Sequence, residues 1–354
     1  MFSDNDRISW LQMERQISLA YLGPVLLLLP GSVWGRNGIL SVILGTGILF
    51  VWIFFLLRQV NVYKYPERYW GKWPARGIAL IFQVYLAATG GWLLAVIMRL
   101  LSEYLIPGIP GWVLGLLAAA AALTGSRDIQ SRGRFAQAAW PLAAALLGFL
   151  LLLAAFQGDS GLMMEETRRG SLWSRENLKQ IGEGTISYVG MLLGITLLPF
   201  SLSQTESKAG HRQSVFRTVG RLGLWAGAVL LLQLAVLGPA GREYHRFPML
   251  DLMAGAKIPG GFLRRLDLIF LTAAMFALLF SLGSVFFYSK YIWSRVGVGA
   301  GRLSMAAASF LLANISFGGW EIREEYGALV LYIFLPLLAA VGICSGLLRR
   351  RKVG

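Results

Sequence analysis

The chain has 354 residues, of which 56% are hydrophobic and only 14% are charged, and its mean hydropathy is +0.60. Because soluble domains carry roughly 25% charged residues, this composition excludes an ordinary soluble protein and predicts that most of the chain lies in a lipid bilayer. The net charge of +15 is typical of loops retained on the cytoplasmic side of a membrane, so we expect no nucleic-acid partner.

At about 20 residues per span, about ten apolar segments could cross a bilayer. The pattern predicts an all-α polytopic membrane protein in which residues 1–354 form a single transmembrane domain. The fourth and ninth segments are short and could each be a re-entrant piece, so the count of ten is approximate. The segments lie near residues 9–30, 38–57, 77–100, 112–124, 135–156, 185–203, 222–240, 266–289, 303–318 and 326–347.

The first apolar segment contains a proline in its middle, within the run ISLAYLGPVLLLLP of residues 17–30. Pro24 has no N–H and its ring crowds the preceding turn, so the helix is predicted to kink or unwind near residues 20–23. Any backbone group freed at that depth must be satisfied by protein, water or a ligand.

A second interruption lies in the sixth segment, where GMLLGITLLP runs from Gly190 to Pro199. The ten segments form two groups of five, each of which opens with an interrupted helix. Since five is an odd number, the two groups must insert with opposite orientation, as in an inverted repeat. The expected parts are a first repeat (9–156), an outer amphipathic linker (157–184), a second repeat (185–347) with an outer loop (241–265), and a cytoplasmic basic tail (348–354).

Lysine and arginine residues are concentrated in alternate loops. If the N-terminus is cytoplasmic, the inside loops hold most of them, and most of the outside charges fall in two long loops, which count less toward topology. The sequence therefore predicts that both termini are cytoplasmic. Mixed charges around apolar residues in the linker (157–184) indicate one or two short amphipathic helices or, equally well, a solvated loop.

Residue types that carry out catalysis or bind metals are scarce. Cys344 is the only cysteine, which excludes an intramolecular disulfide and a cysteine metal site. The two histidines, His211 and His245, fall in loops predicted on opposite sides of the membrane and cannot share a site. We therefore expect no enzyme activity, no catalytic residue, no metal and no cofactor.

Charged residues are also expected to be absent from the interior of spans two, three, five, six, eight and ten. Because intramembrane ionisable groups mark proton relays and ion pathways, this absence disfavours proton-coupled transport. A sodium site built from carbonyl and hydroxyl oxygens would need no charged residue.

Paired helix interruptions near the bilayer midplane are typical of ligand sites. The ends of half-helices offer N–H groups to a carboxylate and carbonyl groups to an ammonium, which suits a small zwitterion such as an amino acid. The alternative is that each polar side chain only bonds a neighbouring helix. The candidate ligand-binding residues are Ser18, Tyr21, Gly23, Pro24, Gln83, Tyr85, Gly190, Gly194, Thr196 and Thr272, and the other polar residues of these spans are Gln16, Thr89, Ser201, Gln233, Ser281 and Ser284.

The outer segment RFPMLDLMAGAKIPGGFLRRLDLIF, from Arg246 to Phe270, and the LLPF of Leu197 to Phe200 resemble the spore germination protein family, the GerAB-type B subunits of nutrient germinant receptors. The resemblance implies the LeuT-like fold of the amino acid–polyamine–organocation (APC) transporter superfamily, with a five-plus-five inverted repeat. It also implies a location in the spore inner membrane and sensing of an amino acid or similar nutrient. The implied partners are an A subunit and a C-subunit lipoprotein.

Three functions are compatible with these features. The first is a receptor subunit that binds a small nutrient at the breaks in spans one and six and signals germination to partner subunits. The second is an amino-acid permease of the APC superfamily that works by alternating access. The third is a structural scaffold for the partner subunits, which predicts that changing the residues at the breaks leaves the germinant response intact.

Overall fold

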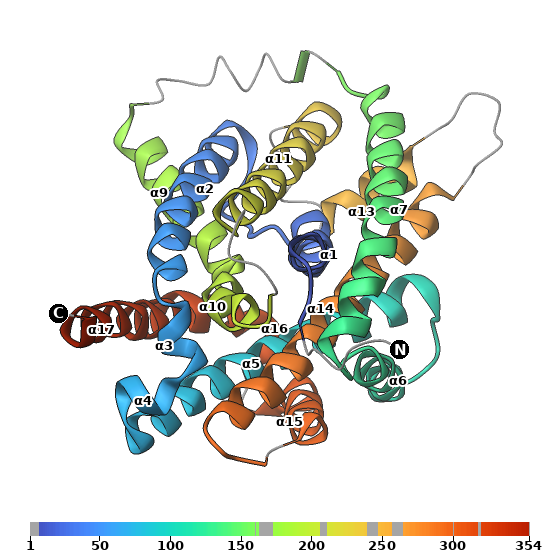
Figure 1. The fold of residues 1–354 in the computed structure, drawn as a ribbon. Coiled ribbons are helices and arrows are strands. Elements are labelled where there is room, and N and C mark those ends of the chain that lie inside the picture. Colours follow the sequence, from blue (N-terminus) through green and yellow to red (C-terminus); the bar gives the residue numbers. More distant parts are fainter. Residues whose placement is uncertain are drawn as a thin grey trace.

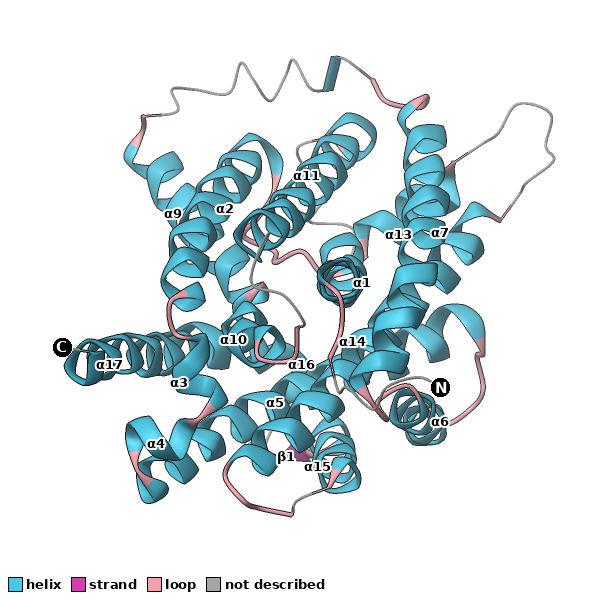
Figure 2. Ribbon diagram, viewed as in Figure 1, coloured by secondary structure: helices cyan, strands magenta, loops and turns pink. Residues whose placement is uncertain are grey.

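A computed structural model of the chain is almost entirely helical (Figures 1 and 2). It describes residues 7–159, 161–162, 173–205, 211–238, 247–256, 265–299, 301–317 and 320–353. Within these residues, strands are limited to one short antiparallel hairpin of β1 (Ser316–Phe317) and β2 (Trp320–Glu321). The prediction of an all-α fold is confirmed.

Five helices correspond to the first five predicted spans, and two short helices connect the second of them to the third. The five are α1 (Trp10–Leu27), α2 (Gly35–Leu57), α5 (Lys72–Leu100) with a π-helical turn (Leu101–Leu105), α6 (Gly111–Thr124) and α7 (Ile129–Ala155); the connecting helices are α3 (Val60–Lys64) and α4 (Pro66–Trp70).

The other five predicted spans also fall on helices. These are α9 (Arg175–Met191) with a 3-10 turn (Leu193–Leu197) and α10 (Leu198–Leu202), then α11 (His211–Leu237), α14 (Leu266–Arg295), α15 (Arg302–Asn314), and α16 (Ile322–Leu329) with a π-helical turn (Val330–Phe334) and α17 (Leu335–Val353). A further short helix, α13 (Pro248–Gly255), precedes α14.

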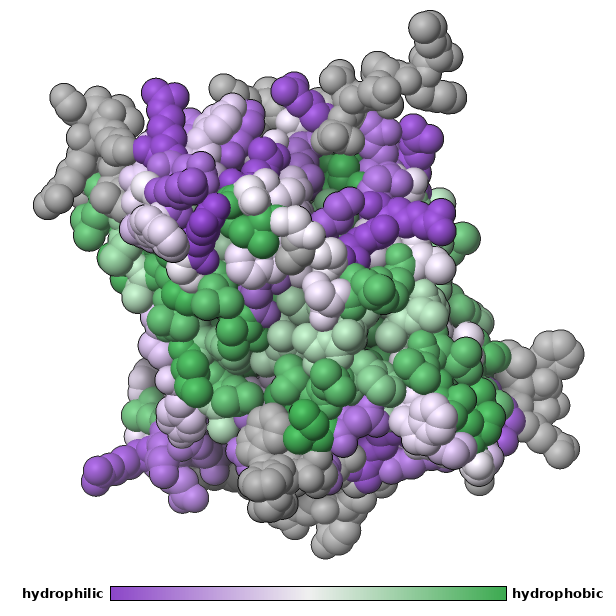
Figure 3. Space-filling view, turned by 90° about the horizontal axis from the view of Figure 1, so that it is seen from below, coloured by the Kyte–Doolittle hydropathy of each residue, from purple (hydrophilic) through white to green (hydrophobic). Residues whose placement is uncertain are grey.

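Six helices of the described chain are long and apolar enough to cross a membrane, or seven if α9 and α10 form one bent span. Seen from the side, a band of hydrophobic residues crosses the middle of the molecule, with hydrophilic residues above and below it (Figure 3). Long apolar helices and an apolar belt are the features of a multi-pass integral membrane protein. Helices α6 and α15, at 14 and 13 residues, are shorter than a full span.

Helix α1 occupies the centre of the bundle, where it contacts α7, α11 and α14 (Figure 1). Its start is a capping box, the Ser-x-x-Gln pattern. The Ser9 hydroxyl accepts from the Gln12 N–H at 3.3 Å, and the Gln12 side chain accepts from the Ser9 N–H at 3.1 Å. Next to it, the Ile8 N–H donates to the Gln204 carbonyl at 2.9 Å, which ties the start of α1 to the segment after α10.

Several boundaries differ from the sequence prediction. Helix α9 begins at Arg175, inside the predicted linker (157–184), because Ser174 caps it by accepting from the Asn177 N–H. Helix α17 continues through most of the predicted tail (348–354). Parts of the linker, of the outer loop (241–265) and of the segment that carries the family resemblance lie outside the described residues, which omit 160, 163–172, 239–246 and 257–264.

Candidate functional site

Helix α1 runs without interruption through Pro24, so the predicted unwinding at residues 20–23 does not occur. Proline cannot donate to the carbonyl four residues earlier, which leaves the Ala20 carbonyl without its helical partner. The Ser281 hydroxyl of α14 shares its single hydrogen between this carbonyl and, at 2.9 Å, the Ala277 carbonyl of its own helix. A side chain from a distant helix therefore supplies the missing donor, and α1 remains helical.

The predicted interruption of the sixth span is confirmed, because α9 and α10 meet at an angle of 44° across the 3-10 turn (Leu193–Leu197). The turn places Gly194 against the tyrosines of two other helices. A methyl group on Gly194 would clash with the Tyr21 hydroxyl of α1 and would lie 3.4 Å from the Tyr85 hydroxyl of α5. Only glycine allows the two hydroxyls to approach the bend this closely.

A cavity of about 120 Å³ lies between α1, α5, the α9–α10 bend, α11, α14 and α16. Every one of these elements except α11 contributes a hydroxyl group to its lining, α1 also contributes an amide, and none of its lining residues is acidic or basic. Ligand pockets are usually ~300–1,000 Å³, so a cavity of this size is suited to a small molecule. The polar lining residues are Gln16, Tyr21, Tyr85, Thr89, Ser201, Ser281, Ser284, Tyr288 and Tyr326.

Some of these hydroxyl groups already bond one another. The Thr89 and Tyr326 hydroxyls are 2.9 Å apart, and the Trp92 ring stacks on Tyr326 with ring centroids 4.5 Å apart. On the other side of the cavity, the Tyr288 hydroxyl bonds Ser201 of α10. Since each tyrosine or serine hydroxyl can both donate and accept, the cavity can bind either charged end of a zwitterion without a charged side chain.

An ion pair joins α1 to α11 beside the cavity. The buried Glu14 carboxylate accepts from Arg221 and, at 2.6 Å, from the Ser214 hydroxyl. The sequence boundaries for span seven left Arg221 outside the helix, whereas the structure includes it in α11. Removing Arg221, whose side chain is 39% exposed, would leave the buried Glu14 carboxylate without its counter-charge, so the pair links these two helices.

The structure brings four of the predicted ligand-binding residues together in the cavity wall. Tyr21 and Pro24 line it from α1, Tyr85 lines it from α5, and Gly194 lines it from the bend. Five other polar residues that the sequence singled out also line it, namely Gln16, Thr89, Ser201, Ser281 and Ser284.

Three predicted site residues instead fit closely against neighbouring helices. A methyl group on Gly23 would lie 2.9 Å from the Leu278 nitrogen of α14, and one on Gly190 would lie 2.9 Å from the Val330 side chain. Gln83 donates to the Ser289 carbonyl at 3.0 Å and accepts from its hydroxyl at 2.6 Å. These three residues pack α1, α5 and α9 against other helices, and they do not line the cavity.

The remaining three candidates also lie outside the cavity wall. Ser18 and Thr196 are buried, and their hydroxyl oxygens make no hydrogen bond. Thr272 is exposed on α14 and bonds the Leu268 carbonyl of its own helix at 2.7 Å. Local sequence could not separate these residues from the cavity residues, because both sets are small polar groups in apolar helices.

Sequence reasoning did not select Tyr288, Tyr326 and Trp92, which complete the cavity wall. Tyr288 and Tyr326 lie at the ends of predicted spans, where aromatic residues are common at membrane interfaces and carry no specific signal, and Trp92 is an apolar residue inside an apolar span. Only the packing of α5, α14 and α16 brings them to the α9–α10 bend.

The predicted span five (135–156) contains no charged residue, but the helix that forms it begins earlier. Helix α7 begins at Ile129 and contains the buried Arg132. Its guanidinium donates to the Gly125 carbonyl at 3.1 Å, the Phe280 carbonyl at 3.4 Å and the Ser284 hydroxyl, and it lies over the Phe280 ring. Through Ser284, this cation is one hydrogen bond away from the cavity.

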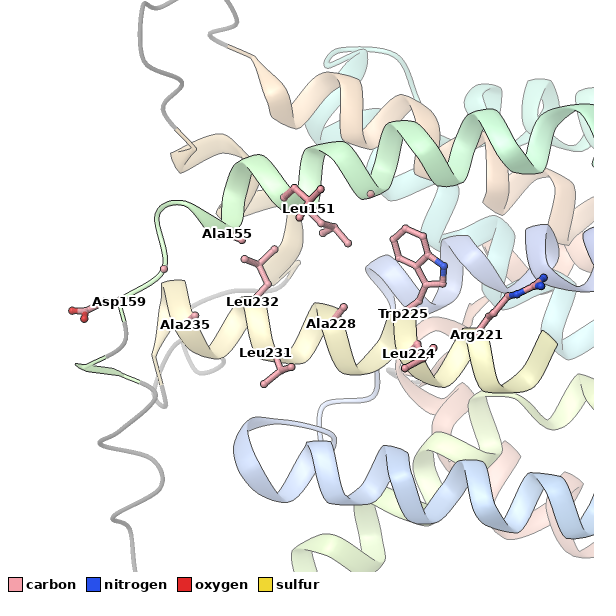
Figure 4. A pocket seen from close by; sticks show the side chains of 13 residues that line it. Leu151, Ala155, Asp159, Arg221, Leu224, Trp225, Ala228, Leu231, Leu232 and Ala235 are labelled. Carbon is pink, nitrogen blue, oxygen red and sulfur yellow. The ribbon is translucent and has the colours of Figure 1, made fainter. Parts of the chain in front are cut away.

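A larger cavity of about 770 Å³ lies between α7 and α11 (Figure 4). Its walls are almost entirely apolar, with Trp225 and Leu232 on α11 facing Leu151 on α7. Lining residues such as Leu152 and Leu224 are 65% and 74% exposed, so this groove belongs to the outer apolar surface. It offers no converging polar groups, and we do not assign the ligand site to it.

The chain matches a protein-family model, and its fold is similar to the folds of solved structures. A family model described as spore germination protein matches residues 7–296. The structure is similar to MhsT in complex with L-phenylalanine, with a TM-score of 0.69, 15% identity, and coverage of 98% of this chain and 89% of that chain. It is also similar to a Na⁺-coupled sialic acid symporter in a substrate-bound outward-open state, with a TM-score of 0.61, 12% identity, and coverage of 97% and 78%.

These neighbours are transporters of the LeuT fold, so their similarity shows that this chain has that fold. At 12% and 15% identity, the likeness says nothing more about ligands. No curated protein sequence matches the chain.

Proposed function

The chain belongs to the spore germination protein family, and we propose that it is the integral-membrane B subunit of a spore germinant receptor. In this proposal a small nutrient, such as an amino acid, binds in the cavity between α1 and the α9–α10 bend, and the occupied state signals germination to partner subunits. The observation that carries the proposal is the uncharged, hydroxyl-lined cavity at the junction of six helical elements.

The chemistry of the cavity favours a zwitterion. The last turn of α9 ends at Met191, which lines the cavity, and the C-terminal end of a helix carries partial negative charge that stabilises an ammonium group. The hydroxyls of Tyr21 and Tyr85 can donate to a carboxylate. The Ser284 hydroxyl accepts from Arg132 and donates to the Phe280 carbonyl at 2.9 Å, so its one hydrogen is already used.

The location and partners of the protein are further parts of the proposal. Family membership supports the spore inner membrane as its site, with both termini in the cytoplasm as the lysine and arginine distribution predicts. An A subunit and a C-subunit lipoprotein are the partners that would receive the signal.

A thermal-shift screen of the purified protein against single amino acids and sugars tests the ligand site. A ligand at 100 times its Kd stabilises the native state by ~2.7 kcal/mol if it does not bind the unfolded chain. We expect a hit that is reduced by Tyr21→Phe, which removes one cavity hydroxyl, and is unchanged by Tyr332→Phe, a tyrosine that is 80% exposed. Equal ligand-induced shifts of the unfolding temperature in the wild type, Tyr21→Phe and Tyr332→Phe would contradict the proposed ligand site.

The alternative function is an amino-acid permease that works by alternating access, and the fold of the two transporter neighbours favours it. Uptake of labelled amino acid into vesicles that contain this chain alone distinguishes the two. Accumulation of the ligand would support the permease, whereas binding without uptake would support the receptor subunit.

A further inference from the structure

A third pocket, of about 480 Å³, lies at one end of the bundle, where α6 ends, α15 begins and the last turns of α14 pass. Three cations from three separate parts of the chain line it, namely Arg127 in the α6–α7 connection, Lys290 on α14 and Arg302 at the start of α15. The other lining residues are Leu123, Thr124, Gly301 and Leu303, so no acidic residue lines the pocket.

These three cations are available to a ligand. In the part of the chain that the structure describes, the buried Nη1 of Arg302 has no hydrogen-bond partner. Arg127 and Lys290 are exposed at the pocket. The nearest acid along the chain, Asp128, does not line the pocket, and its carboxylate caps α7 by accepting from the Ser131 N–H at 2.6 Å.

The start of α15 adds a fourth element that favours an anion. Its N-cap is Gly301, which has no side chain to satisfy the first N–H groups of this 13-residue helix. Unpaired N–H groups and the positive end of the helix dipole both favour a bound anion. Scattered positive charge on a membrane protein only sets topology, but here three cations and a helix start converge on one concave surface.

We propose that this pocket binds the phosphate group of an anionic phospholipid. Helices α6 and α15 both end at the pocket, and their 14 and 13 residues span only about 20 Å, against about 30 Å of hydrocarbon. A short helix draws lipid headgroups inward at its end, which would bring phosphates to the level of the cations. Beside Arg302, Leu303 is 72% exposed and offers an apolar surface to the acyl chain.

The test titrates the full-length protein in detergent micelles with short-chain phosphatidylglycerol and reads bound lipid by native mass spectrometry. Short-chain phosphatidylcholine and inorganic phosphate are titrated in parallel. We expect phosphatidylglycerol to bind most tightly, and Arg302→Gln to lower its affinity about fivefold, since one cation near a membrane surface contributes the free energy of about a fivefold change. Arg217→Gln, which removes an exposed cation on α11 outside the pocket, should leave the affinity unchanged.

The triple variant Arg127→Gln, Lys290→Gln and Arg302→Gln should bind phosphatidylglycerol no better than phosphatidylcholine. Circular dichroism and gel filtration check its folding, and if it fails to fold, the comparison of Arg302→Gln with Arg217→Gln decides alone. Equal affinity for the two lipids in the wild-type protein, or equal loss in the two single variants, would overturn the proposal. Inorganic phosphate that binds as tightly as phosphatidylglycerol would overturn it in favour of a soluble phosphate ligand.

Discussion

Helix α1 and the α9–α10 pair both contain glycine and proline within an apolar segment, yet α1 is continuous and the other segment bends by 44°. The difference lies in what surrounds each proline. At Pro24, the carbonyl that loses its donor receives a hydrogen bond from Ser281. At Pro199, the preceding residues form a 3-10 turn, and the proline becomes an early residue of a new helix, where its missing N–H costs little.

The comparison shows that proline alone does not determine whether a membrane helix breaks. A freed carbonyl in a bilayer must find a donor, and the outcome depends on whether packing provides one. In this protein the hydrogen bond from Ser281 to the Ala20 carbonyl also lies beside the ligand cavity, because Ser281 and Pro24 both line that cavity. The continuous α1 and the bent α9–α10 pair therefore form two opposing walls of one site.

The largest expected effect comes from filling the space at the bend. Gly194→Leu would place a side chain where the Tyr21 hydroxyl lies, so we expect loss of ligand binding and a destabilisation of about 1–3 kcal/mol. Thermal shifts with and without ligand measure both quantities. Gly182→Leu is the control, since that glycine lies on α9, the helix before the bend, with nothing within 4 Å of an added methyl group; if both variants lost binding equally, the bend would have no special role.

The role of Ser281 at Pro24 is tested by a double-mutant cycle. Ser281→Ala should cost about 1–3 kcal/mol, because it leaves the Ala20 carbonyl buried and unpaired. In a Pro24→Ala background the restored N–H can donate to this carbonyl, so Ser281→Ala should then cost much less. Chemical or thermal unfolding of the wild type, the two single variants and the double variant gives the coupling free energy between the two positions. Additive losses would mean that Ser281 does not compensate for the proline.

The starts of the two helices provide a smaller comparison. Ser9→Ala should destabilise the protein by about 1 kcal/mol, because it removes the hydroxyl that accepts from the part-buried Gln12 N–H, while the Ser9 N–H can still donate to the Gln12 side chain. Ser174→Ala removes the bond to the Asn177 N–H of α9, which is exposed and can bond water instead, so it should cost less. Unfolding temperatures of the two variants rank them. The reverse order would contradict the view that the start of α1 is the more tightly held.

The smallest expected effect is at Thr272. Its exposed side chain bonds only its own helix, so Thr272→Val should change stability by no more than about 0.5 kcal/mol and leave ligand binding intact. A matched change in the cavity wall, Thr89→Val, removes the hydrogen bond to Tyr326 and should weaken binding. A binding defect in Thr272→Val would show that the site extends beyond the cavity described above.

The sequence by itself determined the fold class, the approximate positions of the helices, the break between Gly190 and Pro199, and the family. Apolar length, glycine and proline placement, and the segment from Arg246 to Phe270 carry that information locally. Segment ends were less well determined, since the structure places Arg132 and Arg221 inside helices, where one bonds carbonyls and the other a carboxylate.

Only the tertiary structure decided that α1 stays helical at Pro24 and that Tyr288 and Tyr326 complete the cavity. It also placed Gly23, Gln83 and Thr272 outside the cavity wall. The reason is physical: the donor to the Ala20 carbonyl comes from a residue 261 positions away, so no local pattern contains it. A freed backbone group is satisfied by whatever side chain folding brings to it, and that is a property of the packed bundle.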